Sequence, residues 1–245
     1  MTRKRIDVLM MDRGLFDSRA KAREAIEAGR VRADGVLVAK PSEMVEEHVS
    51  IRASPAHPWV GRGALKLLHA LETWPIAVEG KVAIDVGAST GGFTEVLLSR
   101  GAAKVYAVDV GREQLHASLV EHERVRDLSG TDARILDESW IEEAPELIVS
   151  DVSFISVEKC LPAALDLAAP GADLVSLIKP QFEAGRERVG KGGMVKDEAV
   201  IADCIASVRA FVEAAGWTVQ GVILSPITGG DGQVEHLLWA RKDQV

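Results

Sequence analysis

Short apolar runs alternate with helical patterns over most of the chain. Four runs of strand length are separated by amphipathic stretches, and they are residues 82–86, 105–110, 147–152 and 174–178. This alternation predicts a parallel sheet with helices on both faces. Two final runs, residues 219–224 and 235–240, have no helical pattern between them and should pair as an antiparallel hairpin. The predicted fold class is therefore α/β, a doubly wound Rossmann-like sheet that closes in an antiparallel hairpin.

The first fifty residues follow a different pattern. Apolar positions in residues 5–11 recur at helical spacing, and Ser18 is suited to cap a second short helix. Residues 30–33 alternate, and Asp34-Gly35 is a preferred pair for a type I′ hairpin turn before the strand resumes. We therefore expect a small N-terminal α+β domain that presents arginines on one surface.

The length and composition of the chain indicate how many domains it contains. The chain has 245 residues, of which 47% are hydrophobic and 27% charged, which suits one large domain or a large and a small one. Residues 52–60 contain two prolines and no periodicity, as in a linker. We expect domains at residues 1–51 and 61–245 with a linker at 52–60.

Residues 1–66 hold 13 Lys and Arg against 9 Asp and Glu, whereas the remainder holds 16 against 28. This basic head favours a polyanion partner, although charge alone fits a solvated surface equally well.

Several classes of protein are disfavoured. The basic N-terminus is interrupted by Asp7 and Asp12 and no cleavage site follows, so we expect no export and a cytoplasmic location. No apolar run is long enough to cross a bilayer. Cys160 and Cys204 lie in apolar helical patterns, which predicts buried, reduced thiols. The histidines are scattered, so we predict no metal site.

The segment AIDVGASTGGFTEVLL, residues 83–98, predicts a strand, a glycine-rich turn and a helix, the arrangement that holds nucleotide-like cofactors. Ser89 stands where the second glycine of a dinucleotide fingerprint is required, and no lysine follows Gly92 as in a P-loop. S-adenosylmethionine has no phosphate and needs only close backbone approach, which Gly87, Gly91 and Gly92 permit. The sequence therefore favours this cofactor, with Ser89 and Phe93 in the same loop.

Two acidic residues complete the predicted cofactor site. Asp109 ends the next strand and could accept hydrogen bonds from ribose hydroxyls. Asp132 follows the third strand and is placed to meet the adenine amino group. Strand-end aspartates also occur in α/β proteins without this cofactor, so that alternative stays open.

Four ionisable residues stand at strand ends or in loops: Lys66, Asp151, Lys179 and Glu235. Strand ends at one edge of a parallel sheet converge on the ligand crevice. A ribose hydroxyl is a weak nucleophile, and a lysine amine can take its proton if burial or another cation lowers the pKa of that amine. The two carboxylates would orient the amines. The alternative is that the lysines only form surface ion pairs.

Residues 5–42 resemble the alpha-L RNA-binding domain of a small-subunit ribosomal protein, pseudouridine synthases and tyrosyl-tRNA synthetases. The pattern SR-x-x-A-x-x-x-I-x-x-G-x-V-x-x-x-G is nearly complete. The resemblance implies contacts to RNA phosphates. Its candidate residues are Arg5, Arg19, Lys21, Arg23, Arg30, Arg32 and Lys40.

The whole chain resembles the TlyA family, in which an RNA-binding head is fused to an FtsJ-like methyltransferase domain. The segments that support this are GRGALKLLHAL, DVGASTGGFTEVLLSRGAAKVYAVDVG, DVSFISV and LIKPQFEAGRERVGKGGMVKD. The resemblance implies methyl transfer from S-adenosylmethionine to a cytidine 2′-hydroxyl of ribosomal RNA, with Lys66, Asp151, Lys179 and Glu235 as the catalytic tetrad. Short family forms favour the large subunit, and we expect a monomer. Two departures are Gly61, where serine is usual, and Asp132, where asparagine is common.

RNA contacts outside the head are expected from the glycine-rich loop after Lys179. Its cations are Arg186, Arg188, Lys191 and Lys196, and we hypothesise that this loop orders over bound RNA. Two other functions stay open. The family's old name suggests a membrane-acting hemolysin, and a non-catalytic RNA-binding or ribosome-assembly factor would also keep the basic head.

Overall fold

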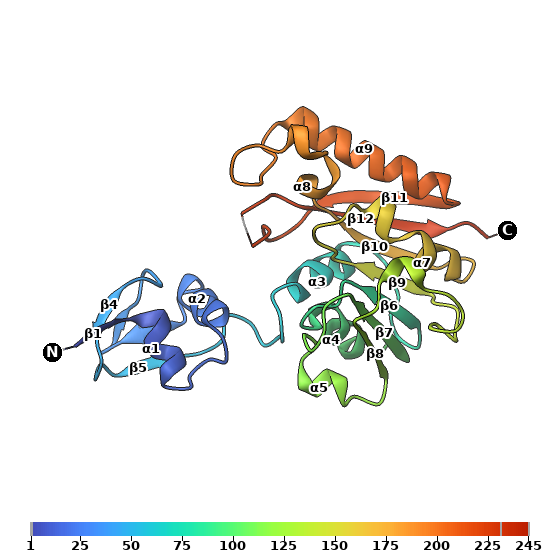
Figure 1. Cartoon of the computed structure of the whole chain (residues 1–245). Coiled ribbons are helices and arrows are strands. Elements are labelled where there is room, and N and C mark those ends of the chain that lie inside the picture. Colours follow the sequence, from blue (N-terminus) through green and yellow to red (C-terminus); the bar gives the residue numbers. More distant parts are fainter. Residues whose placement is uncertain (1, 231, 245) are drawn as a thin grey trace. The chain divides into compact units, whose positions relative to one another are not determined.

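The computed structural model describes residues 2–230 and 232–244, and the chain divides into two compact units (Figure 1). Unit 1 spans residues 1–58 and unit 2 spans residues 59–245. Both cysteines are buried and free, as predicted. No helix in the described ranges is long and apolar enough to cross a membrane.

Unit 1 is a small α+β fold. Its elements are β1 (Arg3–Arg5), α1 (Ile6–Asp12), α2 (Arg19–Glu27), β2 (Val31–Ala33), β3 (Val36–Leu37), β4 (Met44–Glu46) and β5 (Ile51–Ala53). Ser18 caps α2 by accepting a hydrogen bond from the Lys21 amide, as predicted. Asp34 and Gly35 have φ of +48° and +80°, which are the conformations that a type I′ turn between β2 and β3 requires.

Strand pairing in unit 1 surrounds one apolar core. β1 pairs with β4, and β2 lies between β3 and β5. The core is formed by side chains from both helices and from the strands: Ile6, Leu9, Met10, Ala22, Ala25, Ile26, Val31 and Val45. β5 pairs with β2 as far as Ala53, so the first two residues of the expected linker belong to a strand.

The described part of unit 2 contains a seven-stranded sheet in the order β11-β12-β10-β9-β6-β7-β8. The strands are β6 (Val82–Val86), β7 (Lys104–Asp109), β8 (Val125–Ser129), β9 (Leu147–Ser150), β10 (Asp173–Ile178), β11 (Trp217–Leu224) and β12 (His236–Lys242). β8, β7, β6, β9 and β10 are parallel, and β12 is antiparallel to both β10 and β11. The predicted doubly wound sheet and its closing hairpin are confirmed.

Helices cover both faces of this sheet (Figure 1). They are α3 (Ala64–Thr73), α4 (Gly92–Ser99), α5 (Ala117–Val120), α6 (Val157–Cys160), α7 (Pro162–Leu167), α8 (Pro180–Glu183) and α9 (Glu198–Ala214), with 3-10 turns η1 (Ala133–Ile135) and η2 (Arg186–Arg188). Successive strand residues point to opposite faces, so Ala83 joins the core with α3 and α4 and Ile84 joins the core with α7 and α9. Burial of both faces explains the continuous apolar runs of the central strands.

Candidate active site

The four predicted catalytic residues lie at one edge of the sheet. Asp151 follows β9, Lys179 follows β10, and Glu235 immediately precedes β12, which runs in the opposite direction. Lys66 extends from the first turn of α3. The carboxyl ends of parallel strands and the amino end of their antiparallel neighbour meet at the same edge, which brings these side chains together.

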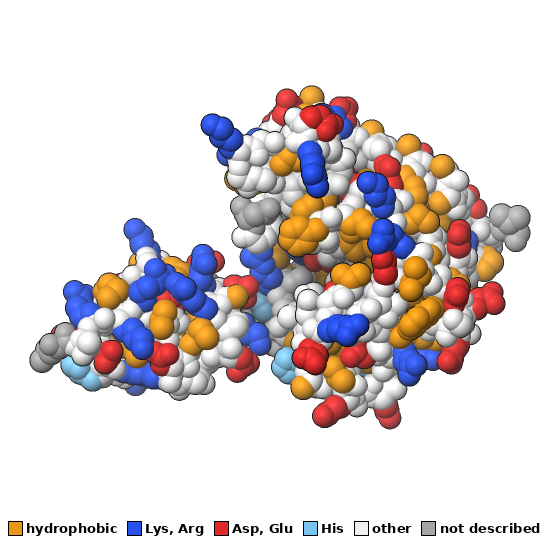
Figure 2. Space-filling model, in the orientation of Figure 1, with side chains coloured by type: hydrophobic (Ala, Val, Ile, Leu, Met, Phe, Trp, Pro, Cys, Tyr) orange, Lys and Arg blue, Asp and Glu red, His pale blue; other side chains and the backbone are white. Residues whose placement is uncertain are grey.

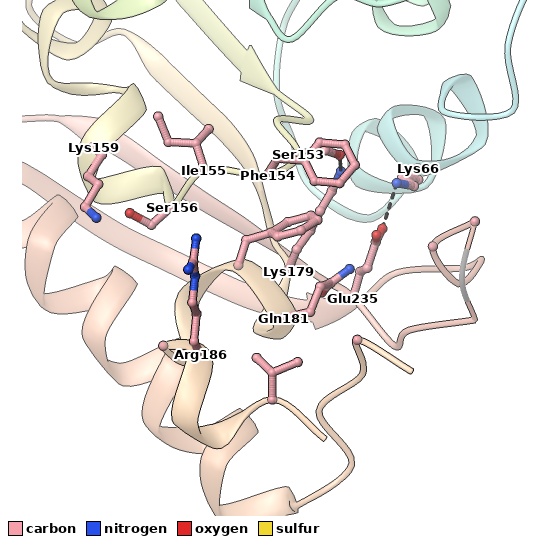
Figure 3. Close-up of a pocket in the computed structure, with 16 residues that line it drawn as sticks. Lys66, Ser153, Phe154, Ile155, Ser156, Lys159, Lys179, Gln181, Arg186 and Glu235 are labelled. Atoms are coloured by element: carbon pink, nitrogen blue, oxygen red, sulfur yellow. Dashed lines mark hydrogen bonds and ion pairs between the residues drawn. The ribbon is translucent and has the colours of Figure 1, made fainter. Parts of the chain in front are cut away.

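The four side chains form a single row of alternating charge, of which Figure 3 draws Lys66, Lys179 and Glu235. Lys66 Nζ lies 2.7 Å from Glu235 Oε2 and 3.1 Å from Asp151 Oδ2. Lys179 Nζ lies 2.7 Å from Asp151 Oδ1. Lys66, Lys179 and Glu235 are only 5%, 7% and 2% exposed. These are buried pairs, so the alternative of surface ion pairs is wrong.

Ser153 extends this row and was not predicted. Lys179 Nζ donates a 2.7 Å hydrogen bond to Ser153 Oγ and a longer one, 3.4 Å, to the Asp151 carbonyl. Ser153 also lines both of the larger cavities described below. A polar residue two positions after a strand-end aspartate was the available sequence signal. Ser153 therefore gives Lys179 a second side-chain partner besides Asp151.

A cavity of about 610 Å³ lies beside the row, at the predicted cofactor loop. Its lining includes Gly87, Ser89, Asp109 and Asp132. Gly87 has φ of +85°, and a Cβ there would stand 3.1 Å from the Val152 side chain and 3.2 Å from the Asp151 backbone. The loop can therefore approach β9 only with glycine at this position. The volume is in the usual range for small-molecule sites, so the residues present fit S-adenosylmethionine.

Asp109 holds the shape of this loop. Its Oδ2 accepts a 2.8 Å hydrogen bond from the Ser89 amide, and its Oδ1 accepts a 2.7 Å bond from the Gly111 amide. Ser89 has φ of +47°, an unfavourable conformation for a residue other than glycine, and the Asp109 bond helps to hold it. Each carboxylate oxygen retains acceptor capacity toward the cavity.

Asp132 lines the same cavity but has a strong partner. Its carboxylate accepts hydrogen bonds from Arg134 Nε at 3.0 Å and from Arg134 Nη2 at 2.5 Å. The bound Arg134 guanidinium lowers the pKa of Asp132, so this carboxylate stays charged. A contact from Asp132 to the adenine amino group thus shares the carboxylate with Arg134 and remains a prediction.

Three of the predicted cofactor residues do not line the 610 Å³ cavity. Gly91, with φ of +94°, packs beneath α5, because a Cβ there would lie 2.2 Å from Leu119 Cδ1. Gly92 and Phe93 begin α4 and line a smaller cavity of about 250 Å³ that also contacts Asp151 and Lys179. The glycine pattern alone cannot distinguish a glycine that faces a ligand from one that faces a helix.

Asp85, a further residue without a predicted role, is fully buried at the end of β6. Its Oδ2 accepts a 2.7 Å hydrogen bond from Thr94 Oγ1. Burial raises the pKa of this carboxyl to about 7, and the nearby charge of Asp151 adds to the rise. Asp85 therefore places a titratable group beneath the glycine loop.

A second cavity, of about 930 Å³, begins at the charged row (Figure 3). Lys66, Lys179 and Glu235 line one end, and Lys159 and Arg186 line the rest together with aromatic side chains. Lys159 and Arg186 have no ion-pair partner among the residues that the structure describes. The space is large enough for a nucleotide and is bordered by cations suited to phosphate.

Phe154 lines both the cavity of about 610 Å³ and the cavity of about 930 Å³. It has φ of +67° and is 91% exposed, which is unusual for so large an apolar side chain. Its ring centroid lies 5.3 Å from that of Phe182. Sequence reasoning gave Phe154 no role, although an aromatic residue in a loop after a strand-end aspartate was a usable signal.

The predicted RNA-contact residues of unit 1 occupy four kinds of environment. Arg5 and Arg19 contact the buried Asp7, Lys21 pairs with Asp17, and Arg32 donates to the Gly35 carbonyl. Exposed positions are held by Arg23, Arg30 and Lys40. Figure 2 shows many Lys and Arg side chains on the visible face of unit 1.

The basic loop after Lys179 is anchored at two points. Arg188 donates to the Ala184 carbonyl and pairs with Asp203 on α9. The buried Gln233 side chain exchanges two hydrogen bonds with the Val195 backbone, at 2.7 and 2.9 Å. Lys191 and Lys196 are exposed. That the loop closes over bound RNA stays a hypothesis.

Within the described ranges, no group of three or more His, Cys, Asp or Glu side chains is arranged to hold a metal ion.

Comparisons with known proteins agree with this architecture. The FtsJ-like methyltransferase family matches residues 59–242, and the S4 domain family matches residues 4–51. The chain is 46% identical to the 16S/23S rRNA (cytidine-2′-O)-methyltransferase TlyA of Mycobacterium tuberculosis, over 98% of this chain and 90% of that one. It is 37% identical to the 23S rRNA (cytidine-2′-O)-methyltransferase TlyA of Campylobacter jejuni, over 76% and 72%.

A solved structure also matches nearly the whole chain. A protein from Streptococcus thermophilus that is named a hemolysin superposes with a TM-score of 0.78 at 39% identity, covering 99% of this chain and 90% of that one. The match extends across both units and is far closer than fold similarity alone requires. The chain belongs to the TlyA family of FtsJ-like methyltransferases with an S4 domain, and its cofactor is S-adenosylmethionine.

Proposed function

We propose that this enzyme transfers a methyl group from S-adenosylmethionine to the 2′-hydroxyl of a cytidine in ribosomal RNA, and that it prefers the large subunit. The observation that supports this most directly is the buried Lys66–Asp151–Lys179–Glu235 row, which lies between a cofactor-sized cavity and a larger, cation-bordered one. The names of the two TlyA relatives share 23S RNA and the cytidine 2′-hydroxyl.

The row is suited to removing one proton. S-adenosylmethionine supplies an electrophilic methyl group, and the attacking oxygen must lose its proton as the new O–C bond forms. Lys179 in its neutral amine form accepts this proton and becomes an ammonium ion. Asp151, at 2.7 Å, neutralises that charge as it develops, while Ser153 Oγ, also at 2.7 Å, fixes the direction of the amine.

Lys66 and Glu235 act on Lys179 through Asp151. Lys66 Nζ donates to both Asp151 oxygens, to Oδ2 at 3.1 Å and to Oδ1, which also contacts Lys179, at 3.3 Å, so it shares the carboxylate charge and keeps that side chain in one orientation. Glu235 in turn holds Lys66 at 2.7 Å. With both lysines protonated the four charges sum to zero and each has a partner of opposite charge, which offsets the cost of burying the row; Lys179 must lose its proton before it can act as the base.

The larger cavity is suited to a nucleotide that has left its stack. Enzymes that modify a single nucleotide often extrude it, because its reactive atom is inaccessible within a helix. The exposed Phe154 ring offers a flat apolar face for the base, and Lys159 and Arg186 offer positive charge for a flanking phosphate. Unit 1 supplies further phosphate contacts, which compensates for the net negative charge of the rest of the chain.

The test is transfer of a labelled methyl group to unmodified large subunits, unmodified small subunits and naked ribosomal RNA. Nuclease digestion and mass spectrometry then identify the modified nucleoside, with subunits that are already methylated as the matched control. The proposal predicts 2′-O-methylcytidine, formed mainly in large subunits. Label on a base, or none in any RNA, would refute the reaction, and label only in small subunits would refute the subunit preference.

A further inference from the structure

Unit 1 contains a fully buried carboxylate that is bound by two arginines. Asp7 is 0% exposed, although it lies in the first turn of α1. Arg5 donates to it through Nε at 3.0 Å and Nη2 at 2.9 Å, and Arg19 donates through Nε at 2.8 Å. Arg5 ends β1 and Arg19 begins α2, so the Asp7 side chain links two elements that are separated in the sequence.

Both arginines remain accessible despite this contact. The side chains of Arg5 and Arg19 are 41% and 50% exposed. Each uses only part of its guanidinium on Asp7, and the remaining N–H donors have no partner among the residues that the structure describes. Both groups bind the same Oδ2 atom, so the two guanidiniums lie close together. Two neighbouring guanidiniums offer several N–H donors, which a phosphate group binds well.

The buried Asp7 carboxylate is expected to add little to the net stability of unit 1 compared with an apolar residue at the same position. Burying an ion costs several kcal/mol, about what its partners return, and a well-packed apolar residue is often as stable. The hydrogen bond from Arg5, supported by Arg19, lowers the pKa of Asp7 to about 2 against the effect of burial. The cluster therefore keeps its charges over the whole physiological range of pH.

We propose that Asp7 is a positioning residue that fixes Arg5 and Arg19 as one phosphate-binding fork for structured RNA. This rests on the proposed function, because it assumes that unit 1 binds ribosomal RNA. Without Asp7 each arginine would sample many rotamers, and the entropy of ordering both would be lost on binding. Holding them in place before RNA arrives removes that cost.

The substitution Asp7→Asn separates positioning from charge, because the two predict opposite signs. Removing one negative charge beside the RNA surface should strengthen binding if only net charge matters. If Asp7 positions the fork, the affinity should instead fall, about fivefold to tenfold. The matched control is Asp17→Asn, which removes an exposed carboxylate paired with Lys21 in the same unit. Its affinity should be unchanged or slightly higher.

Binding is measured with the full-length protein and unmodified large ribosomal subunits over a range of KCl concentrations. Methyl transfer on the same subunits then gives KM and kcat separately. We expect Asp7→Asn to raise KM by about the same factor by which it weakens binding. The value of kcat should be unchanged at saturation, because the tetrad lies in unit 2. Arg5→Lys combined with Arg19→Lys keeps Asp7 and every charge but lacks the fork, and should also bind more weakly.

The outcomes are distinct. The fork is supported if Asp7→Asn and the double lysine variant both bind more weakly than the wild type while amide hydrogen exchange shows that unit 1 is folded. If Asp7→Asn unfolds unit 1, weaker binding by the double lysine variant alone supports it. Equal or tighter binding by folded Asp7→Asn, or wild-type affinity in the double lysine variant, overturns the proposal while the proposed function stands. If the wild type neither binds nor methylates any subunit, the proposed function fails and this inference fails with it.

Discussion

Lys66 gives the sharpest test of how the charged row is held together. The substitution Lys66→Met keeps the length of the side chain and removes its ammonium group. Glu235, which is 2% exposed, then has no cation within the row, whereas Asp151 keeps Lys179 at 2.7 Å. The perturbation therefore leaves one buried carboxylate without its partner.

The size of the effect follows from that burial. Removing one member of a buried ion pair typically costs about 3–5 kcal/mol, because the remaining charge is uncompensated. For a unit of this size each kcal/mol lowers the melting temperature by about 2–4 °C, so we expect a decrease of roughly 10 °C. Adding Glu235→Gln removes the stranded charge, and the double variant should melt within a few degrees of the wild type.

The assay combines thermal unfolding with methyl transfer. Both the single and the double variant should lose most activity, because Asp151 loses the hydrogen bonds from Lys66 that orient it. The double variant thus recovers stability without recovering function. The reasoning is refuted if Lys66→Met melts at the wild-type temperature, or if the double variant regains activity along with its stability.

Three further predictions follow from single contacts. Gly91→Ala should lower the stability of unit 2 by about 2 kcal/mol, seen in thermal unfolding, because its Cβ would lie 2.2 Å from Leu119 Cδ1 at a φ of +94°; a wild-type melting temperature would contradict this. Lys159→Ala should reduce the slope of log affinity against log salt for subunits by about 1, with Arg209→Ala on α9 as the charge-matched control, and an equal slope change in both would argue against a phosphate contact in the cavity. Asp7 has its pKa lowered to about 2, so it contributes about 2 kcal/mol to the stability of unit 1 above pH 4, and this is lost as pH falls toward 2. Acid unfolding of unit 1 should accordingly be flatter in Asp7→Asn, and the same slope in both proteins would show that Asp7 is not the group that titrates.

The sheet could be predicted from sequence where burial on both faces makes strands continuously apolar. β6, β9 and β10 are of this kind, and their ends also placed Asp151 and Lys179 correctly at one edge. β8, the third strand before Asp132, did not stand out as an apolar run because it is an edge strand in which polar and apolar residues are mixed. The tetrad could be predicted from the sequence because the ends of neighbouring strands meet at one edge of the sheet, regardless of the conformation of the loops.

Contacts between loops were not accessible in the same way. Whether a glycine faces a ligand or a helix depends on tertiary packing, as Gly91 beneath α5 shows. Arg5 and Arg19 were predicted as RNA contacts but not as partners of one carboxylate, because nothing in the spacing of Asp7 reveals that α1 buries its carboxylate between them. Ser153 and Phe154 depend on the path of a loop after β9, which no periodicity specifies.

The central claim is that Lys179 accepts the proton from the 2′-hydroxyl, and the most direct measurement is the single-turnover rate of methyl transfer to unmodified large subunits by Lys179→Ala. Calorimetric titration with S-adenosylmethionine and subunit binding are measured in parallel. We predict that the rate falls by about 10²–10⁴-fold, as for loss of a general base, while both binding constants stay near those of the wild type. A rate within a few-fold of the wild type, with both ligands bound, would contradict the assignment of Lys179 and with it the proposed chemistry of the row.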